Sequence, residues 1–243
     1  MATIPRRRGP PGPGITVRPG AERDRTTSAW LDSRHTFAFG TYDRVWSGLG
    51  PLKVLNEDRI APGGAFGLHP HWDMEIVTFV LAGELTHEDS LGHRATLRAG
   101  EVQYISAGTG IEHAERNASL TESVHLFQIW IAPSRKGLPP LYQQVPTPRG
   151  EGLSLIAGPA STGAPVALQQ DVETYRGVVP GGRTLSHVLR DGHTAWLQVA
   201  RGAVAVGDHQ LGAGDGAAII GQEGVEVVAE GDAWFLLFDL GRS

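Results

Sequence analysis

The chain carries the same order of strands and glycine-bearing turns twice, and this repeat constrains the fold more than any other feature. In the first half, an apolar strand passes through Gly83 and a polar hairpin to the segment 97–101 and a second apolar strand. In the second half, Gly202 and the segment 211–215 take the same places, with a shorter hairpin between them. Repetition of this kind indicates a duplicated structural unit.

The local pattern predicts strands rather than helices. Short apolar or alternating runs, such as 76–81, 125–131 and 234–238, are separated by turns. Glycine (33 residues) and proline (16 residues) make up about a fifth of the 243 residues, which favours many turns between short strands. We therefore predict an all-β protein built from two tandem β-barrels or sandwiches.

Composition shifts suggest where these units begin and end. Residues 1–14 combine arginine, proline and glycine with few apolar residues, so we expect a disordered tail. We expect the first unit over 15–140, a linker over 141–165 and the second unit over 166–243.

Charge and composition exclude several classes of function. The net charge of −5 does not favour a direct nucleic-acid partner. No apolar stretch is long enough to span a bilayer and no secretory signal is present, so we expect a cytoplasmic protein, monomeric by default. Because the chain has no cysteine, a bound metal would need imidazole and carboxylate ligands.

Two short motifs supply such ligands. His69 and His71 alternate in one segment and His113 and Glu115 in another, so each pair shares one face of a strand. Three imidazoles and a carboxylate suit a divalent transition metal: Fe(II), Mn, Co, Ni, Cu or Zn. Glu75 has the same parity as the first pair, so spacing alone leaves both glutamates open as the carboxylate ligand.

These motifs resemble known families. Gly67, His69-x-His71-x3-Glu75 and Gly83, followed by Gly100-x5-Ser106-x-Gly108 and His113-x3-Asn117, resemble the two motifs of the cupin superfamily. More narrowly, HPH, HEDSLGH and SAGTGIEHAE, with LDSRHTFAFG before them and IWI-P after them, are similar to the pirin family of bicupins. The resemblance covers residues 15–243. The run Trp72-Asp73-Met74 departs from the Arg-Gly-Phe found in some pirin-like proteins.

The resemblance implies two tandem cupin barrels with one metal in the N-terminal barrel. It implies that the metal, Fe(II) in the first place, is held by His69, His71, His113 and Glu115, with Glu75 in a structural or supporting role. The implied activity is that of a quercetin 2,3-dioxygenase, an oxidoreductase that cleaves flavonols with O2 and releases carbon monoxide. Glu115, or else Glu75, would be the catalytic base. The alternative is a non-enzymatic, redox-responsive regulator that binds a protein partner.

The repeat predicts that the second unit lacks metal ligands. Aligned on its glycines, the second copy places Val188, Arg190, Val227 and Ala229 where the first has its ligands. His187 and His193 flank these places, and we expect surface or turn roles for them. We also expect His87 and His93, in the HEDSLGH hairpin, to face solvent.

Overall fold

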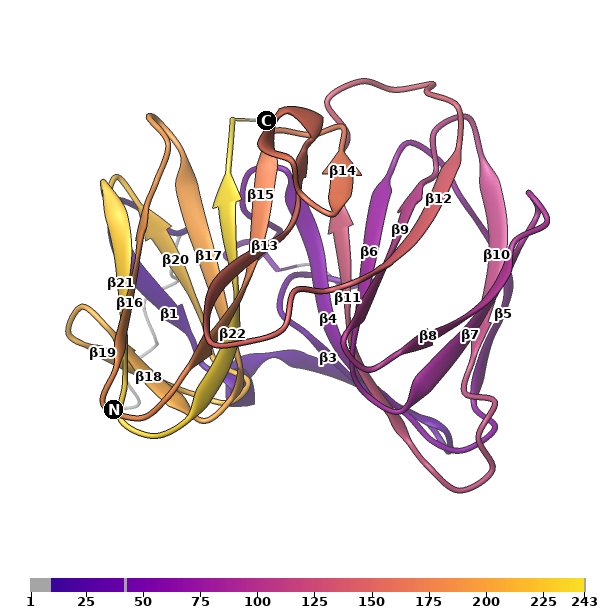
Figure 1. The fold of residues 1–243 in the computed structure, drawn as a ribbon, viewed down its shortest axis with the longest axis horizontal. Coiled ribbons are helices and arrows are strands. Elements are labelled where there is room, and N and C mark those ends of the chain that lie inside the picture. The colour runs from indigo at the N-terminus through magenta and orange to yellow at the C-terminus, as the bar shows by residue number, and fades with distance from the viewer. Residues whose placement is uncertain (1–9, 42, 243) are drawn as a thin grey trace, which may run out of the picture.

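The computed structural model describes residues 10–41 and 43–242, which form two β-barrels side by side (Figure 1). Nearly all regular elements are strands; the two short exceptions are the 3-10 turns η1 (Gly20–Glu22) and η2 (Ala160–Thr162). The prediction of an all-β fold with two barrels is confirmed. Most of the predicted tail, residues 1–9, lies outside the described residues.

The first barrel is made of a large and a small antiparallel sheet. The large sheet has the order β12-β9-β6-β11-β4-β3-β2, and the small sheet has the order β5-β10-β7-β8. Their strands are β2 (Asp24–Thr27), β3 (Leu31–His35), β4 (Leu52–Ile60), β5 (Ala65–His71), β6 (Glu75–Ala82), β7 (Glu84–Asp89), β8 (Arg94–Arg98), β9 (Glu101–Ser106), β10 (Ile111–Arg116), β11 (Val124–Ile131) and β12 (Leu141–Pro146).

The second barrel repeats this plan. Its large sheet has the order β1-β20-β17-β22-β15-β13-β14, and its small sheet has the order β16-β21-β18-β19. Their strands are β1 (Gly14–Arg18), β13 (Gly152–Pro159), β14 (Val166–Leu168), β15 (Val172–Val179), β16 (Thr184–Val188), β17 (Thr194–Arg201), β18 (Ala203–Val206), β19 (His209–Gly212), β20 (Gly216–Ile220), β21 (Gly224–Ala229) and β22 (Ala233–Leu240).

The boundaries between the units differ from the predicted ones. Strand β1, expected in the first unit, pairs with β20 of the second barrel. Within the predicted linker 141–165, β12 pairs with β9 of the first barrel and β13 pairs with β15 of the second. Because an unpaired sheet edge leaves backbone groups without partners, these flanking segments become strands that extend the large sheets.

Apolar side chains form separate cores. One cluster joins the two large sheets and includes Phe127, Trp196 and Phe238. A second, continuous cluster fills the second barrel. The interior of the first barrel is instead divided between two small clusters, one containing Leu126 and the other Ile76.

Polar side chains occupy the gap between those two small clusters. On β11, the inward-facing residues run from Leu126 through Gln128 to Trp130, and on β6 they run from Val80 through Thr78 to Ile76. A buried polar layer is costly unless its groups are paired or hold a ligand. The interior of the first barrel is therefore built differently from that of the second, and this layer contains the predicted site.

Candidate metal centre

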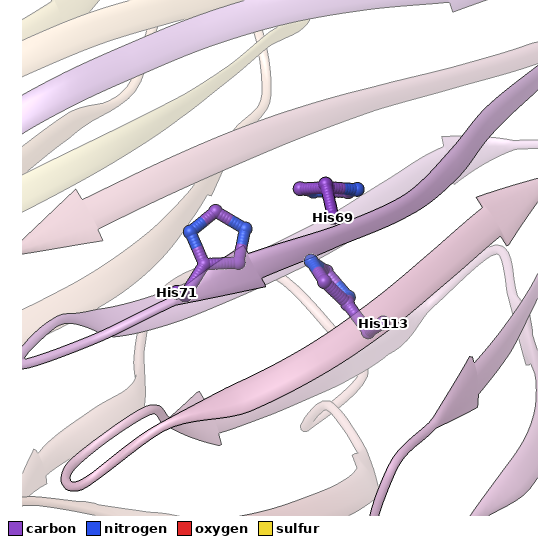
Figure 2. Close-up of side chains that lie close together, drawn as sticks. All are labelled: His69, His71 and His113. Carbon is purple, nitrogen blue, oxygen red and sulfur yellow. The ribbon is translucent and has the colours of Figure 1, made fainter.

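Three of the predicted ligands converge inside the first barrel. Strands β5 and β10 are antiparallel, and His113 lies opposite His69 while Ile111 lies opposite His71. One ring nitrogen from each histidine lies within 4.8 Å of the others. Figure 2 shows the three rings turned toward a common space between the two strands. Alternation along the strands, as predicted from the sequence, brings these imidazoles together.

The ring nitrogens in this group are available for coordination. The Nδ1–H of His69 donates to the carbonyl oxygen of Gly67 at 2.7 Å, which leaves its Nε2 lone pair free. The Nε2 atom of His113 is buried and has no hydrogen-bond partner. An orphaned nitrogen of this kind, facing two other imidazoles, fits a site for a transition metal.

Burial keeps two of these rings neutral. Burial, together with neighbouring His113 and His69, lowers the pKa of His71 to about 4. Burial, with His69 and His87 nearby, lowers the pKa of His113 to about 3. At neutral pH both rings therefore have a lone pair to offer, as a metal ligand requires.

Glu115 is the carboxylate nearest to this group. It is buried, and its Oε1 lies 4.0 Å from His113 Nδ1. Gln103 donates to its Oε1 at 2.8 Å and Gln128 donates to its Oε2 at 3.0 Å. Two amides thus hold this carboxylate beside the histidines, although it falls in a second group of potential ligands, with His87 and His113, rather than in the first.

Glu75 lies on a different face of the chain. Between β5 and β6 the chain bends at Asp73, whose φ is 45°, so the alternation that begins at His69 does not continue to Glu75. Its Oε2 accepts hydrogen bonds from the Tyr104 hydroxyl at 2.6 Å and the Gln169 backbone at 2.7 Å, and its Oε1 accepts one from the Gln170 backbone. Among the described residues, it belongs to neither group of potential ligands. The structure therefore places it between the barrels, in a structural position.

His87 was expected to face solvent, and this expectation is wrong. The side chain is fully buried, and its ring lies against His113 and the Tyr142 ring. Strand β7 pairs with β10, and Glu115 lies opposite His87. The alternation of Leu85 and His87 on β7 could have indicated this inward face. His93 is 42% exposed, as expected for the hairpin.

The second barrel has lost this arrangement. Its inward-facing cross-strand pairs are Leu185 opposite Val227 and His187 opposite Val225. The expected positions Val188 and Arg190 are wrong, because Val188 is 81% exposed; the sequence alignment had slipped within the hairpin. The ring of His187 is taken up by Asp239, which also binds His193. Within the described chain, no group of potential metal ligands lies in this barrel.

Other features of the described residues do not point to a different centre. A cavity of about 600 Å³ lies at the boundary of the two barrels, beside Trp234 and His125, and none of the predicted ligands lines it. The donor chemistry, rather than cavity size, locates the site. None of the helical segments in the described chain has the length and apolarity needed to cross a bilayer.

Comparison with family models agrees with this division of the chain. Residues 18–131 match the model described as Pirin, and residues 155–240 match the model described as Quercetinase C-terminal cupin domain. The two matched ranges correspond to the two barrels, so the prediction of two tandem cupin barrels is confirmed.

Curated relatives are similar over nearly the whole chain. The protein named Quercetin 2,3-dioxygenase from Escherichia coli (strain K12) is 40% identical over 227 residues, which cover 93% of this chain and 98% of the relative. A Pirin-like protein of Caulobacter vibrioides is 36% identical over 86% of this chain and 92% of its own length.

Solved structures extend the similarity to three dimensions. The crystal structure of YhhW from Escherichia coli has a TM-score of 0.91 and 39% identity, covering 94% of this chain and 98% of that one. The bacterial pirin YhhW in complex with nickel(II) has a TM-score of 0.90 and covers 94% of this chain and 100% of that one. Together with the family models and the buried histidine group, these similarities show that the chain belongs to the pirin family.

Proposed function

We propose that the chain is a metal-dependent dioxygenase that cleaves a flavonol such as quercetin with O2. Its membership of a family whose relatives are named quercetin 2,3-dioxygenase confirms the prediction of an oxidoreductase of this type. The observation that carries the proposed site is the group formed by His69, His71 and His113, with its buried and unpartnered nitrogen.

The metal would be held by His69, His71, His113 and Glu115. A bound divalent transition metal would supply coordination positions beyond the four protein ligands, for O2 and a chelating substrate. We propose Fe(II) as the native ion, and the nickel(II) in the related pirin structure supports a divalent transition metal in general. A movement of the Glu115 carboxylate toward the histidines would complete the ligand set.

Glu115 is also the better candidate for the base. A flavonol must lose its hydroxyl proton to become an electron-rich anion, and a carboxylate beside the metal ligands can accept it. Glu75 is held by three donors at the boundary between the barrels and would not reach that proton.

Aromatic rings beside the histidines support a flat substrate. The Trp130 ring lies 5.1 Å from the His71 ring, and the half-exposed Phe39 ring lies 5.5 Å from Trp130. A flavonol could pack against these rings while its oxygens face the metal. The alternative of a regulator with a protein partner is not favoured by the relatives' names.

Oxygen uptake tests the proposal. The chain, loaded with Fe(II) or Ni(II), is expected to consume O2 and quercetin together and to release carbon monoxide. His113→Ala should abolish metal binding and turnover, whereas the exposed His93→Ala should retain both. Full metal occupancy with unchanged quercetin absorbance would refute the proposed activity.

A further inference from the structure

The His87 and Asp89 side chains form a buried chain of hydrogen bonds that ends on a proposed metal ligand. His113 Nδ1 lies 3.4 Å from His87 Nδ1, and His87 Nε2 lies 3.0 Å from Asp89 Oδ2. The side chains of His87 and Asp89 are fully buried. Strand pairing sets this geometry, since Asp89 lies opposite His113 on the neighbouring strand.

Counting protons along this chain fixes the state of His113. A carboxylate only accepts, so Asp89 requires a proton on His87 Nε2. A neutral His87 then has a lone pair on Nδ1, which must accept from His113. His113 therefore carries its proton on Nδ1, and its buried Nε2 atom, which has no partner, keeps a lone pair.

Both ends of this chain are held in place by packing. The Tyr142 ring stacks on His87, with centroids 4.8 Å apart and planes 19° from parallel. Asp89 Oδ1 accepts hydrogen bonds from the backbone N–H groups of Leu91 at 2.9 Å and His93 at 3.0 Å. Because both His87 nitrogens have partners, the geometry fits a supporting residue better than a ligand, although His87 also lies in the second histidine–carboxylate group.

We propose that His87 and Asp89 are positioning residues, which fix the Nδ1–H tautomer of His113 and so aim its Nε2 lone pair at the metal. This inference rests on the proposed role of His113 as a ligand. Residues that support a ligand in this way commonly change metal affinity by about 10- to 100-fold when replaced.

Asp89→Asn is the sharpest test, because it changes the proton count and little else. The two backbone donors keep the carbonyl oxygen of the new side chain at the Oδ1 position, so its NH2 group faces His87 Nε2. His87 must then accept at Nε2 and donate from Nδ1. This reverses the chain and places the His113 proton on Nε2, where it blocks coordination.

Two measurements decide the proposal. In metal-free protein, nitrogen-15 spectra of the histidine rings should show His113 as the Nδ1–H tautomer in the wild type and as the Nε2–H tautomer in D89N. Nickel(II) affinity, measured by competition with a chelator, should fall at least about 10-fold in D89N and in His87→Phe. His87→Asn, whose carbonyl oxygen can replace the lost acceptor, should recover part of that affinity.

His93→Gln is the matched control, because it alters the exposed neighbour of Asp89 and should leave nickel affinity within twofold. Wild-type His113 with its proton on Nε2, or D89N with unchanged nickel affinity, would overturn the positioning role. A wild-type protein that binds no nickel, or His113→Ala that binds it normally, would instead overturn the proposed metal site.

Discussion

Glu75 of the first barrel accepts a hydrogen bond from the backbone N–H of Gln169, which leads into the second barrel, at 2.7 Å. The same carboxylate accepts hydrogen bonds from Tyr104 and from the Gln170 backbone. Burial raises the pKa of Glu75, while these donors act against that rise. One side chain therefore connects the two barrels at a point where the bend at Asp73 turns it away from the histidines.

Glu75→Gln tests this connecting role. The substitution replaces one accepting oxygen with an NH2 group, so at least one buried donor loses its partner. We expect the free energy of unfolding to fall by about 2 kcal/mol with nickel affinity unchanged. Urea unfolding and chelator competition measure the two quantities. The exposed Glu84→Gln is the control, and a large loss of nickel affinity in E75Q would argue against a purely structural role.

Glu57 predicts a dependence of stability on pH. Burial alone would raise its pKa, but hydrogen bonds from His125 at 2.8 Å and Arg23 at 2.7 Å outweigh this and lower the pKa to about 2, from 4.5. Since the folded-state pKa lies below the unfolded value, the stabilisation is complete above pH 4.5 and is lost as the pH falls toward 2.

Glu57→Gln should therefore cost about 3 kcal/mol at pH 7, and the difference from the wild type should shrink between pH 5 and pH 2. Urea unfolding at pH 7, 5 and 3 measures this trend, with the exposed Glu122→Gln as control. A difference that stays constant across this range would contradict the assigned pKa.

Gly108 allows a close backbone approach next to the site. In the turn before β10 its φ is 45°, and a Cβ atom there would lie 1.9 Å from the carbonyl oxygen of Leu138. That carbonyl also accepts from the backbone of Thr109. We expect Gly108→Ala to lower the free energy of unfolding by more than about 3 kcal/mol and to weaken nickel binding, because the start of β10 must shift.

The control for this prediction is Gly92→Ala, in the hairpin between β7 and β8. Gly92 has a φ of 90°, but no atom lies within 4 Å of an added Cβ. It should cost only the backbone strain of about 1 kcal/mol. Equal effects of the two variants, measured by thermal unfolding, would show that the contact with Leu138 does not matter.

Asp239 predicts that the second barrel depends on an ion cluster and not on a metal. Its fully buried carboxylate lies 2.9 Å from His187 Nε2 and 2.6 Å from His193 Nδ1. Asp239→Asn should lower the free energy of unfolding by about 3 kcal/mol, because it disrupts a buried charged pair. Metal analysis should find one nickel per chain in both proteins. A second nickel in the wild type that is lost in D239N would contradict this.

The sequence by itself determined the features that depend on neighbours along the chain. The repeat around Gly83 and Gly202 predicted two similar barrels, and alternation predicted that His69 and His71 share a face, because side chains on a strand alternate with a period of two. The tertiary structure decided what depends on contacts between distant strands. The bend at Asp73 turned Glu75 toward the second barrel, and the pairing of β7 with β10 buried His87 against His113. Strand register and backbone bends are set by packing of the whole barrel, so spacing in one segment could not predict them.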